Sequence, residues 1–225
     1  MLALVSGGNR GIGLAIARAL ADEGMDLIIV GRNRESLESA KEEIEDLGVK
    51  VWPVACDVSD AAQVKKLAAQ ASKIGKLDIL VNNAGVAYFR NLEENSEEEI
   101  DRMIDVNLRG LIKTTRELLP LMNKGLIINI SSGAGKQGFP GLAVYCATKF
   151  AVIGFTEALA GELEEKGIRA YSICPGDTQT DMWESLFPGT PATYKPEDVA
   201  MEVLHLIRNS KRIHPGKAID VRKHV

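Results

Sequence analysis

Residues 2–13 read Leu-Ala-Leu-Val-Ser-Gly-Gly-Asn-Arg-Gly-Ile-Gly, and this stretch decides the fold. It joins an apolar run of strand length, residues 2–6, to an amphipathic helix predicted over residues 11–23. A nucleotide pyrophosphate binds backbone N–H groups at a helix N-terminus, and the glycines of the turn let it approach without obstruction by side chains. A purely structural turn is the alternative. The strand before the turn and the helix after it favour a phosphate-binding turn.

The same alternation of short apolar runs and amphipathic stretches continues along the chain. The runs lack the every-second-residue polarity of half-exposed strands, which is typical of strands buried on both faces of a parallel sheet. Repeated strand–helix units connect through right-handed crossovers. They predict an α/β fold, a doubly wound and mostly parallel sheet of seven strands flanked by helices on both faces. Strands are predicted at residues 2–6, 27–30, 49–55, 79–81, 126–130, 168–174 and 217–221, and helices at 11–23, 34–47, 61–74, 96–122, 144–166 and 197–208.

Length and composition indicate an ordinary globular chain. It has 225 residues, 45% hydrophobic and 26% charged, with a formal net charge of −4, and one domain is predicted over residues 1–225. The weak negative charge gives no electrostatic reason to expect nucleic acid or a membrane surface as a partner. No uninterrupted apolar run of about 18 residues and no signal-peptide pattern is present, so we expect no membrane span and a cytoplasmic location. The cysteines form no CxxC pair and no group has metal-ligand spacing, so we expect free thiols and no metal site.

The end of the second predicted strand bears on the type of nucleotide. In dinucleotide-binding folds an acidic residue at this position bonds the ribose hydroxyls and favours NAD. This chain has Gly31 there, while Arg32 and Arg10 offer guanidinium groups that pair well with a 2′-phosphate. NADP(H) is therefore favoured, with NAD(H) as the weaker alternative; the other interpretation is that Arg32 and Arg34 are merely solvated residues that open the second helix. Asp57, just after the third strand, would reach an adenine amino group or serve only as an acid at a helix N-terminus.

Tyr145 and Lys149 are four residues apart on one predicted helix, so they share a face. A nearby cation lowers the pKa of a tyrosine from its ordinary value of about 10 toward the range useful for proton transfer. The spacing by itself is common on exposed helices. However, Ser132 follows the fifth strand, at the edge of the sheet where such folds bind ligands. Asn107 is an amide within an apolar stretch, where it needs polar partners.

In these motifs the chain resembles the short-chain dehydrogenase/reductase family, whose members have a Rossmann-like fold. The resemblance runs from residue 2 to about residue 203. The family's TGxxxGxG turn is present with Ser6 in place of threonine. The other matches are the NNAG segment Asn82-Asn83-Ala84-Gly85, the tetrad Asn107, Ser132, Tyr145 and Lys149, and the PGxxxT segment formed by Pro175, Gly176 and Thr180.

The resemblance implies an oxidoreductase that interconverts a carbonyl and an alcohol by direct hydride transfer with NADP(H). Tyr145 would exchange a proton with the substrate oxygen, and Ser132 would hydrogen-bond that oxygen. Lys149 would bind the nicotinamide ribose and lower the tyrosine pKa, while Asn107 would hold a water that relays protons. For Asn82, a sheet-stabilising role and a ligand contact both remain open. The implied cofactor-binding residues are Gly7, Asn9, Arg10, Gly11, Ile12, Gly13, Arg32, Asp57, Val58, Asn83, Ala84, Gly85, Tyr145, Lys149, Pro175, Gly176 and Thr180.

The substrate end follows the family pattern less closely. The substrate loop, about residues 177–196, is short, and its apolar residues would form either a lid or ordinary core. A moderately apolar small-molecule carbonyl or alcohol is the expected substrate. Further pocket candidates by position are Tyr88, Phe89, Gln137 and Phe139, and the lid candidates are Met182, Trp183, Leu186 and Phe187.

The sequence leaves alternatives for the oligomeric state and for the reaction. Many family members end in a VDGG-like strand that builds a tetramer interface, and this chain lacks that glycine pair. A homodimer or homotetramer through the two long helices is expected. The alternatives to a carbonyl reductase or alcohol dehydrogenase are a 3-oxoacyl-carrier-protein reductase, which needs a basic docking surface, and a non-catalytic NADP(H)-binding regulator. Lys124, Lys136 and Arg109 are the candidate docking cations.

Overall fold

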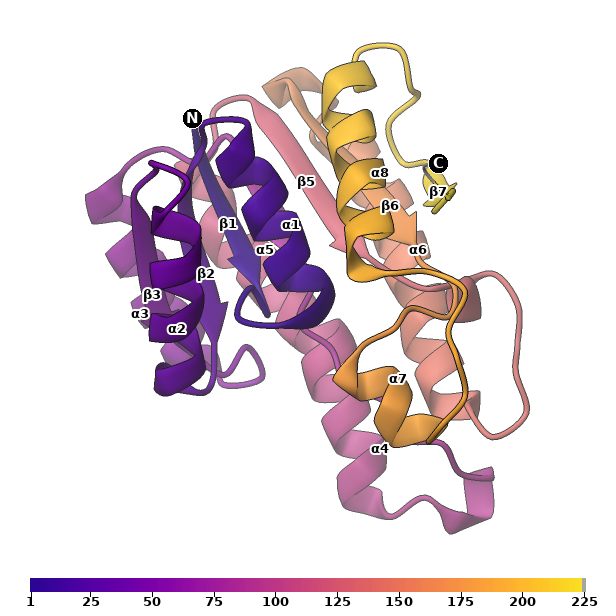
Figure 1. Ribbon diagram of the computed structural model, residues 1–225. Coiled ribbons are helices and arrows are strands. Elements are labelled where there is room, and N and C mark those ends of the chain that lie inside the picture. Colours follow the sequence, from indigo (N-terminus) through magenta and orange to yellow (C-terminus); the bar gives the residue numbers. More distant parts are fainter. Residues whose placement is uncertain (224–225) are drawn as a thin grey trace.

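The computed structural model describes residues 1–223 and contains a seven-stranded sheet in the order β3-β2-β1-β4-β5-β6-β7 (Figure 1). Every pairing between neighbouring strands is parallel, which confirms the doubly wound sheet. Strand order reverses between β1 and β4, and folds of this kind bind ligands in the crevice at such a switch point. The strands are β1 (Leu2–Ser6), β2 (Asp26–Gly31), β3 (Val51–Ala55), β4 (Ile79–Asn82), β5 (Gly125–Ile130), β6 (Ile168–Cys174) and β7 (Ala218–Asp220).

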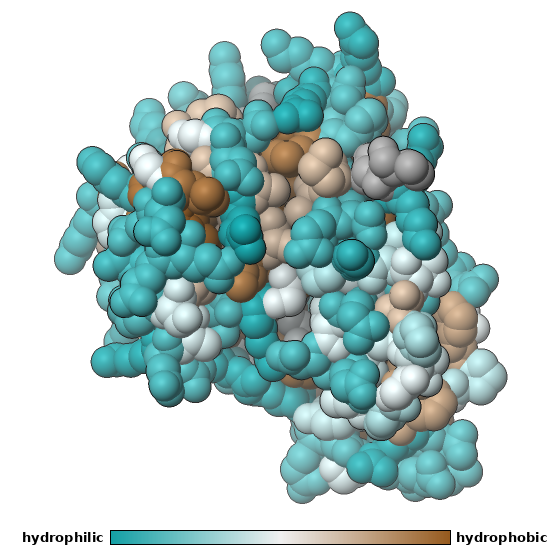
Figure 2. All heavy atoms as spheres, viewed as in Figure 1, coloured by the Kyte–Doolittle hydropathy of each residue, from teal (hydrophilic) through white to brown (hydrophobic). Residues whose placement is uncertain are grey.

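Helices cover both faces of the sheet. One core cluster joins alternate strand residues to α1, α2 and α8, and the other joins the remaining strand residues to α3, α5 and α6. Val5 belongs to the first cluster and Leu4 to the second, which is why the strands are apolar throughout. The face bearing α1, α2 and α8 is largely hydrophilic outside, with small apolar patches (Figure 2). The helices are α1 (Gly11–Asp22), α2 (Arg34–Glu45), α3 (Ala61–Ile74), α4 (Glu97–Ile104), α5 (Leu111–Leu118), α6 (Ala143–Glu162), α7 (Asp181–Leu186) and α8 (Pro196–Asn209).

The helix predicted over residues 96–122 is interrupted. It begins at the capping box of Ser96 and Glu99 as predicted, but a π-helical turn, η2 (Asp105–Gly110), separates α4 from α5. A Cβ on Gly110 would lie 3.0 Å from the Val58 carbonyl oxygen, so the glycine lets this turn approach the loop after β3. A π turn widens the helix by one residue and is frequent at functional sites.

Other elements also differ from the sequence prediction. The helix predicted over residues 144–166 ends at Glu162, and a short 3₁₀ turn, η5 (Glu164–Lys166), precedes Gly167. The last strand is shorter than predicted, and α7 was not predicted because a six-residue helix carries little periodic signal. The one-domain prediction extends to residue 225, and residues 224 and 225 lie outside the described part.

Helix α6 is long and apolar enough, by length and composition, to cross a membrane, with a mean hydropathy of 1.3. The sequence analysis did not identify this helix as a candidate span, because it considered only uninterrupted apolar runs. Its Val152 and Thr156 are fully buried, and it packs on β6 while carrying Tyr145 and Lys149. The helix is therefore a packed element of the α/β fold, although only 39% of its most apolar window is buried within the chain.

Candidate active site

A pocket of about 1250 Å³ lies at the carboxyl ends of the central strands and is lined in part by residues of α7. Of the predicted catalytic and cofactor-binding residues, only Gly13 and Asn107 do not line it. The chain therefore brings together motifs that are far apart in the sequence, such as Gly7 and Thr180. The predicted residues that line it are Gly7, Asn9, Arg10, Gly11, Ile12, Arg32, Asp57, Val58, Asn83, Ala84, Gly85, Ser132, Tyr145, Lys149, Pro175, Gly176 and Thr180.

The glycine turn forms one wall of the pocket. Gly7 and Gly11 have positive φ angles of 67° and 54°, which residues with a Cβ rarely adopt. A Cβ on Gly13 would lie 2.0 Å from the Gly7 carbonyl oxygen, so Gly13 permits close packing behind the turn. Arg10, the N-cap of α1, makes no side-chain capping hydrogen bond. The first N–H groups of α1 are thus available to an anion.

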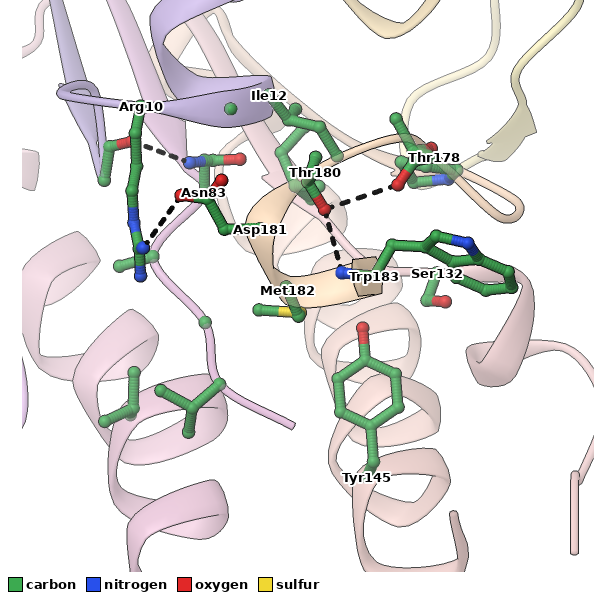
Figure 3. A pocket seen from close by; sticks show the side chains of 18 of the residues that line it. Arg10, Ile12, Asn83, Ser132, Tyr145, Thr178, Thr180, Asp181, Met182 and Trp183 are labelled. Atoms are coloured by element: carbon green, nitrogen blue, oxygen red, sulfur yellow. Dashed lines mark hydrogen bonds and ion pairs between the residues drawn. The ribbon is translucent and has the colours of Figure 1, made fainter. Parts of the chain in front are cut away.

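Ser6 and Asn83 fasten this turn to the end of β4. The Ser6 hydroxyl accepts hydrogen bonds from the backbone N–H groups of Asn83 (3.0 Å) and Ala84 (3.2 Å). The Asn83 amide donates to the carbonyl oxygens of Ser6 (3.0 Å) and Gly7 (3.2 Å). The NNAG segment therefore holds the shape of the glycine turn through side-chain contacts, besides lining the pocket with its backbone (Figure 3).

Asn82 does not line this pocket and instead joins the sheet to the helices. Its amide donates to the Thr115 hydroxyl at 2.9 Å and to Asn129 Oδ1 at 2.8 Å, and Asn129 donates in turn to Thr156 at 2.8 Å. These residues are all at most 3% exposed. Of the two roles left open for Asn82, this network is the sheet-stabilising one.

The nucleotide-type determinants lie at the end of β2. A Cβ on Gly31 would lie 2.5 Å from Asn9 Oδ1, so an acidic side chain here would displace Asn9. Asn9 Nδ2 donates to Ser36 Oγ at 2.8 Å, and Ser36 lines the pocket although sequence reasoning missed it. Arg32 is exposed at the rim, whereas Arg10 forms a 3.2 Å ion pair with the lid residue Asp181 (Figure 3).

Asp57 already has protein partners. Its Oδ1 accepts hydrogen bonds from Ser59 N (3.0 Å) and Ser59 Oγ (2.6 Å), and its Oδ2 accepts one from Arg102 Nη2 (3.0 Å). Burial acts to raise the pKa of Asp57, but these hydrogen bonds outweigh it and hold the pKa below its ordinary value. Arg102 also lines the pocket and was not identified from the sequence.

Ser132, Tyr145 and Lys149 converge at the other end of the pocket. The phenol of Tyr145 points toward the space between Ser132 and the lid (Figure 3). Burial raises the pKa of Tyr145 to about 12, although hydrogen bonding with the Ser132 side chain opposes the shift. Lys149 is 4% exposed, and its Nζ donates to the Ile130 carbonyl oxygen at 2.9 Å. Burial lowers the pKa of Lys149 to about 8.

The raised pKa of Tyr145 differs from the lowered value that the YxxxK spacing predicts. The Lys149 nitrogen lies 5.6 Å from the centre of the Tyr145 ring. The cost of burying a charged phenolate outweighs the attraction of Lys149 for it, so the pKa of Tyr145 rises. Among the protein's own groups, burial therefore decides the protonation of Tyr145.

Asn107 sits in the π turn behind the pocket and is 1% exposed. Its Oδ1 accepts from Val86 N at 2.8 Å, and its Nδ2 donates to Val86 O at 2.8 Å and to Thr148 Oγ1 at 3.2 Å. The side chain thus clamps the backbone after the NNAG segment to α6. Both N–H groups of the Asn107 amide have protein partners, so the predicted proton-relay water would bind either the Asn107 backbone carbonyl or the remaining lone pair of Oδ1.

Helix α7 forms a lid over the substrate end. Met182, Trp183, Leu186 and Phe187 all line the pocket, so the lid alternative holds over core packing. The Phe187 ring contacts the rings of Trp183 (4.5 Å) and Phe89 (4.9 Å between centroids). Gln137 and Phe139 line the pocket as proposed from their positions, whereas Tyr88 and Phe89 do not.

Comparison with known proteins gives consistent findings. The family model described as short chain dehydrogenase matches residues 1–190. Glycine betaine reductase of Emericella nidulans is 37% identical over 226 residues, which cover 94% of this chain, and the chain spans only 18% of that protein. A 3-oxoacyl-(acyl-carrier-protein) reductase of Staphylococcus aureus is 40% identical over 189 residues, covering 82% of this chain and 77% of the relative.

Solved structures of similar fold superpose on almost the whole chain. A short chain dehydrogenase from Burkholderia cenocepacia in complex with NADP has a TM-score of 0.91 and 31% identity, covering 97% of this chain and 95% of its own. A 3-ketoacyl-(acyl-carrier-protein) reductase from Brucella melitensis complexed with NADH has a TM-score of 0.89 and 34% identity, covering 98% and 96%.

Proposed function

Because the chain belongs to the short-chain dehydrogenase/reductase family of oxidoreductases, we propose that it interconverts a carbonyl and an alcohol by hydride transfer with NADP(H). One observation carries the proposal: Ser132, Tyr145 and Lys149 line the same pocket as the glycine turn. A proton-transfer group and a dinucleotide cradle in one cavity are what this reaction needs.

The residues of this chain fit a dinucleotide phosphate. The glycine turn leaves space that a Cβ would fill, and the α1 N-terminus offers unpaired N–H groups for the pyrophosphate. Gly31 places no carboxylate beside a 2′-phosphate, and Arg32 and Arg10 would pair with it. Thr180 at the α7 N-terminus would hold the carboxamide, and Lys149 the ribose. When bound, the nicotinamide supplies or takes the hydride, and its oxidised form adds a positive charge that favours the Tyr145 phenolate.

Tyr145 acts as the acid or base. Its raised pKa of about 12 keeps the phenol protonated near neutral pH, which suits donation of a proton to the oxygen of a carbonyl undergoing reduction. Ser132 hydrogen-bonds the same oxygen and orients the substrate. In the oxidative direction Tyr145 must lose its proton, and the Lys149 ammonium one helical turn away makes that loss less costly.

The walls of the substrate end support a small, moderately apolar carbonyl or alcohol. The lid contributes Met182, Trp183 and Phe187, and the facing wall contributes Leu142 and Phe139. Apart from Lys149, the cationic residues that line the pocket (Arg10, Arg32 and Arg102) lie on the segments that would hold the cofactor. A neutral substrate is therefore favoured over an anionic one.

A 3-oxoacyl-carrier-protein reductase is the second candidate, supported by the relatives that carry this name. It would need free cations beside the cleft for an acidic carrier protein. Lys136 is paired with Asp220 (2.6 Å) and Arg109 with Asp105 (2.6 Å), and Lys124 immediately precedes β5, at the edge of the sheet opposite the pocket. The regulator alternative is least favoured because Ser132, Tyr145 and Lys149 all line the pocket.

The exposed part of α6 supports a homo-oligomer, either a dimer or a tetramer. Phe150 is 46% exposed on a helix whose other exposed positions are mostly alanine and glycine. Small residues let a second helix approach closely, and an exposed apolar strip of this kind is usually covered by a partner. The cytoplasmic location and the absence of nucleic-acid and membrane partners stay predictions.

The test is turnover with a substrate panel. The purified protein should oxidise NADPH with some neutral ketone or diketone, and a panel of aldehydes, ketones, sugars and acyl thioesters separates the candidates. Acyl-carrier-protein substrates preferred over every small ketone would favour the second candidate. Binding of NADPH without turnover of any carbonyl would favour the regulator.

A further inference from the structure

Arg102 spans from α4 to the loop after β3, at the end of the pocket next to Asp57 and Val58. Its Nη2 donates to Asp57 Oδ2 at 3.0 Å and its Nη1 donates to Ser59 Oγ at 3.1 Å. The side chains of Arg102 and Asp57 are 28% and 24% exposed, so the pair is partly shielded from water. Charge-assisted hydrogen bonds in such a place are stronger than those of a fully exposed ion pair.

Asp57 presents a difficulty for cofactor binding that Arg102 removes. A dinucleotide phosphate carries several negative charges, and an uncompensated carboxylate in the wall of its pocket would repel it. Arg102 compensates that charge. Together with Ser59 it also fixes the carboxylate in one orientation, so that an adenine amino group could donate to it.

We propose that Arg102 is a positioning residue for the adenosine half of the dinucleotide and acts through Asp57. The inference rests on the dinucleotide-binding function proposed above. It predicts that loss of Arg102 weakens the binding of both NADPH and NADH, because both carry the adenosine and the pyrophosphate. It also predicts that the chemistry at Tyr145 is unaffected.

The loop after β3 does not depend on Arg102 alone for its conformation. Lys113 Nζ donates to the Ser59 carbonyl oxygen at 3.1 Å, and Asp57 N donates to Gln63 Oε1 at 2.9 Å. Removing the guanidinium therefore leaves two other hydrogen bonds that hold the loop. A change in cofactor affinity in an Arg102 variant can then be separated from collapse of the loop.

The experiment compares Arg102→Met with Arg18→Met. Arg18 on α1 also bridges two elements, pairing with Glu43 of α2 at 2.8 Å, but it does not line the pocket. Dissociation constants are measured for NADPH, NADH and 2′,5′-ADP, which contains the adenosine but no nicotinamide. We expect Arg102→Met to weaken all three by roughly tenfold while kcat at saturating NADPH is unchanged, Arg102→Lys to recover part of the affinity, and Arg18→Met to bind as the wild type does.

The double variant Arg102→Met/Asp57→Asn tests whether Arg102 acts on cofactor binding through Asp57. If Arg102 acts through Asp57, removing it in the Asp57→Asn background should weaken NADPH binding by less than about threefold. An equal loss in both backgrounds would overturn action through Asp57, and an Arg102→Met variant with wild-type affinities would overturn the inference as a whole. Wild-type protein that binds none of the three ligands would instead overturn the proposed function, and these binding measurements need no substrate.

Discussion

The Lys149 ammonium lies 5.6 Å from the centre of the Tyr145 ring and donates a hydrogen bond to the Ile130 carbonyl oxygen. Both residues lie on α6 one turn apart, and Lys149 is nearly completely buried. The pair therefore combines a protonated phenol with an ammonium whose own charge is costly to keep. The effect of this pair on the stability of the fold and its role in proton transfer can be tested separately.

Tyr145→Phe removes the hydroxyl that exchanges the proton and keeps the ring. We expect the turnover number to fall at least about 100-fold, because general acid catalysis contributes about that much or more. NADPH fluorescence titration should give a dissociation constant within about twofold of the wild type, since the ring still fills its place. Turnover close to that of the wild type would remove Tyr145 from the mechanism.

Lys149→Met should change the pH dependence of stability. Burial lowers the Lys149 pKa from 10.5 to about 8. Below about pH 8 the buried lysine is charged, which lowers the free energy of unfolding. That cost disappears as the pH rises toward 10.5, where the unfolded chain also loses the proton. The stability of Lys149→Met relative to wild type should therefore be higher at pH 7 than at pH 10, by at most about 3 kcal/mol. Urea unfolding at the two pH values measures the difference, and an equal or reversed difference would contradict the assignment.

The rates of alcohol oxidation and carbonyl reduction should respond differently to pH. Because the Tyr145 pKa is raised to about 12, the phenol stays protonated across the neutral range and reduction needs no deprotonation. Alcohol oxidation requires the phenolate, so its kcat should rise with pH, while the kcat of carbonyl reduction should not rise. Initial rates at saturating cofactor between pH 6 and 10 measure both directions. An oxidation rate that is flat or falling over this range would argue against Tyr145 as the base.

The strands and the phosphate-binding turn could be predicted because their signals are local. Runs such as Leu27 to Val30 are buried on both faces, so apolar content alone marks them. Arg102 was missed because its partner Asp57 is 45 positions away and an arginine on an acidic amphipathic helix looks solvated. The π turn at Asn107 was missed because it inserts a single residue into an otherwise regular helical period.

Arg32→Ala tests the nucleotide preference. The exposed Arg32 guanidinium lines the rim beside Gly31 and is free to pair with a 2′-phosphate, which NADH lacks. The NADPH dissociation constant should rise roughly tenfold and that of NADH should change by less than twofold. Arg34→Ala is the matched control, since Arg34 is exposed two residues on and does not line the pocket. Equal effects of the two substitutions would favour the interpretation that both arginines are merely solvated.

Phe187→Ala tests the lid. Phe187 lines the substrate end and follows α7; its ring contacts Phe89, which lies outside the pocket lining, with centroids 4.9 Å apart, and Trp183 at 4.5 Å. Truncation removes the contact that holds the lid against the β4–α4 loop, so water enters and apolar substrate loses a wall. For an apolar ketone, kcat/KM should fall by roughly tenfold or more, whereas the NADPH dissociation constant should stay unchanged because the glycine turn and Arg32 are untouched. Leu92→Ala, at a 59% exposed position outside the pocket, is the control for general loss of apolar surface. A Phe187→Ala variant that loses NADPH affinity and ketone turnover in equal measure would show that the aromatic cluster supports the whole fold rather than the lid.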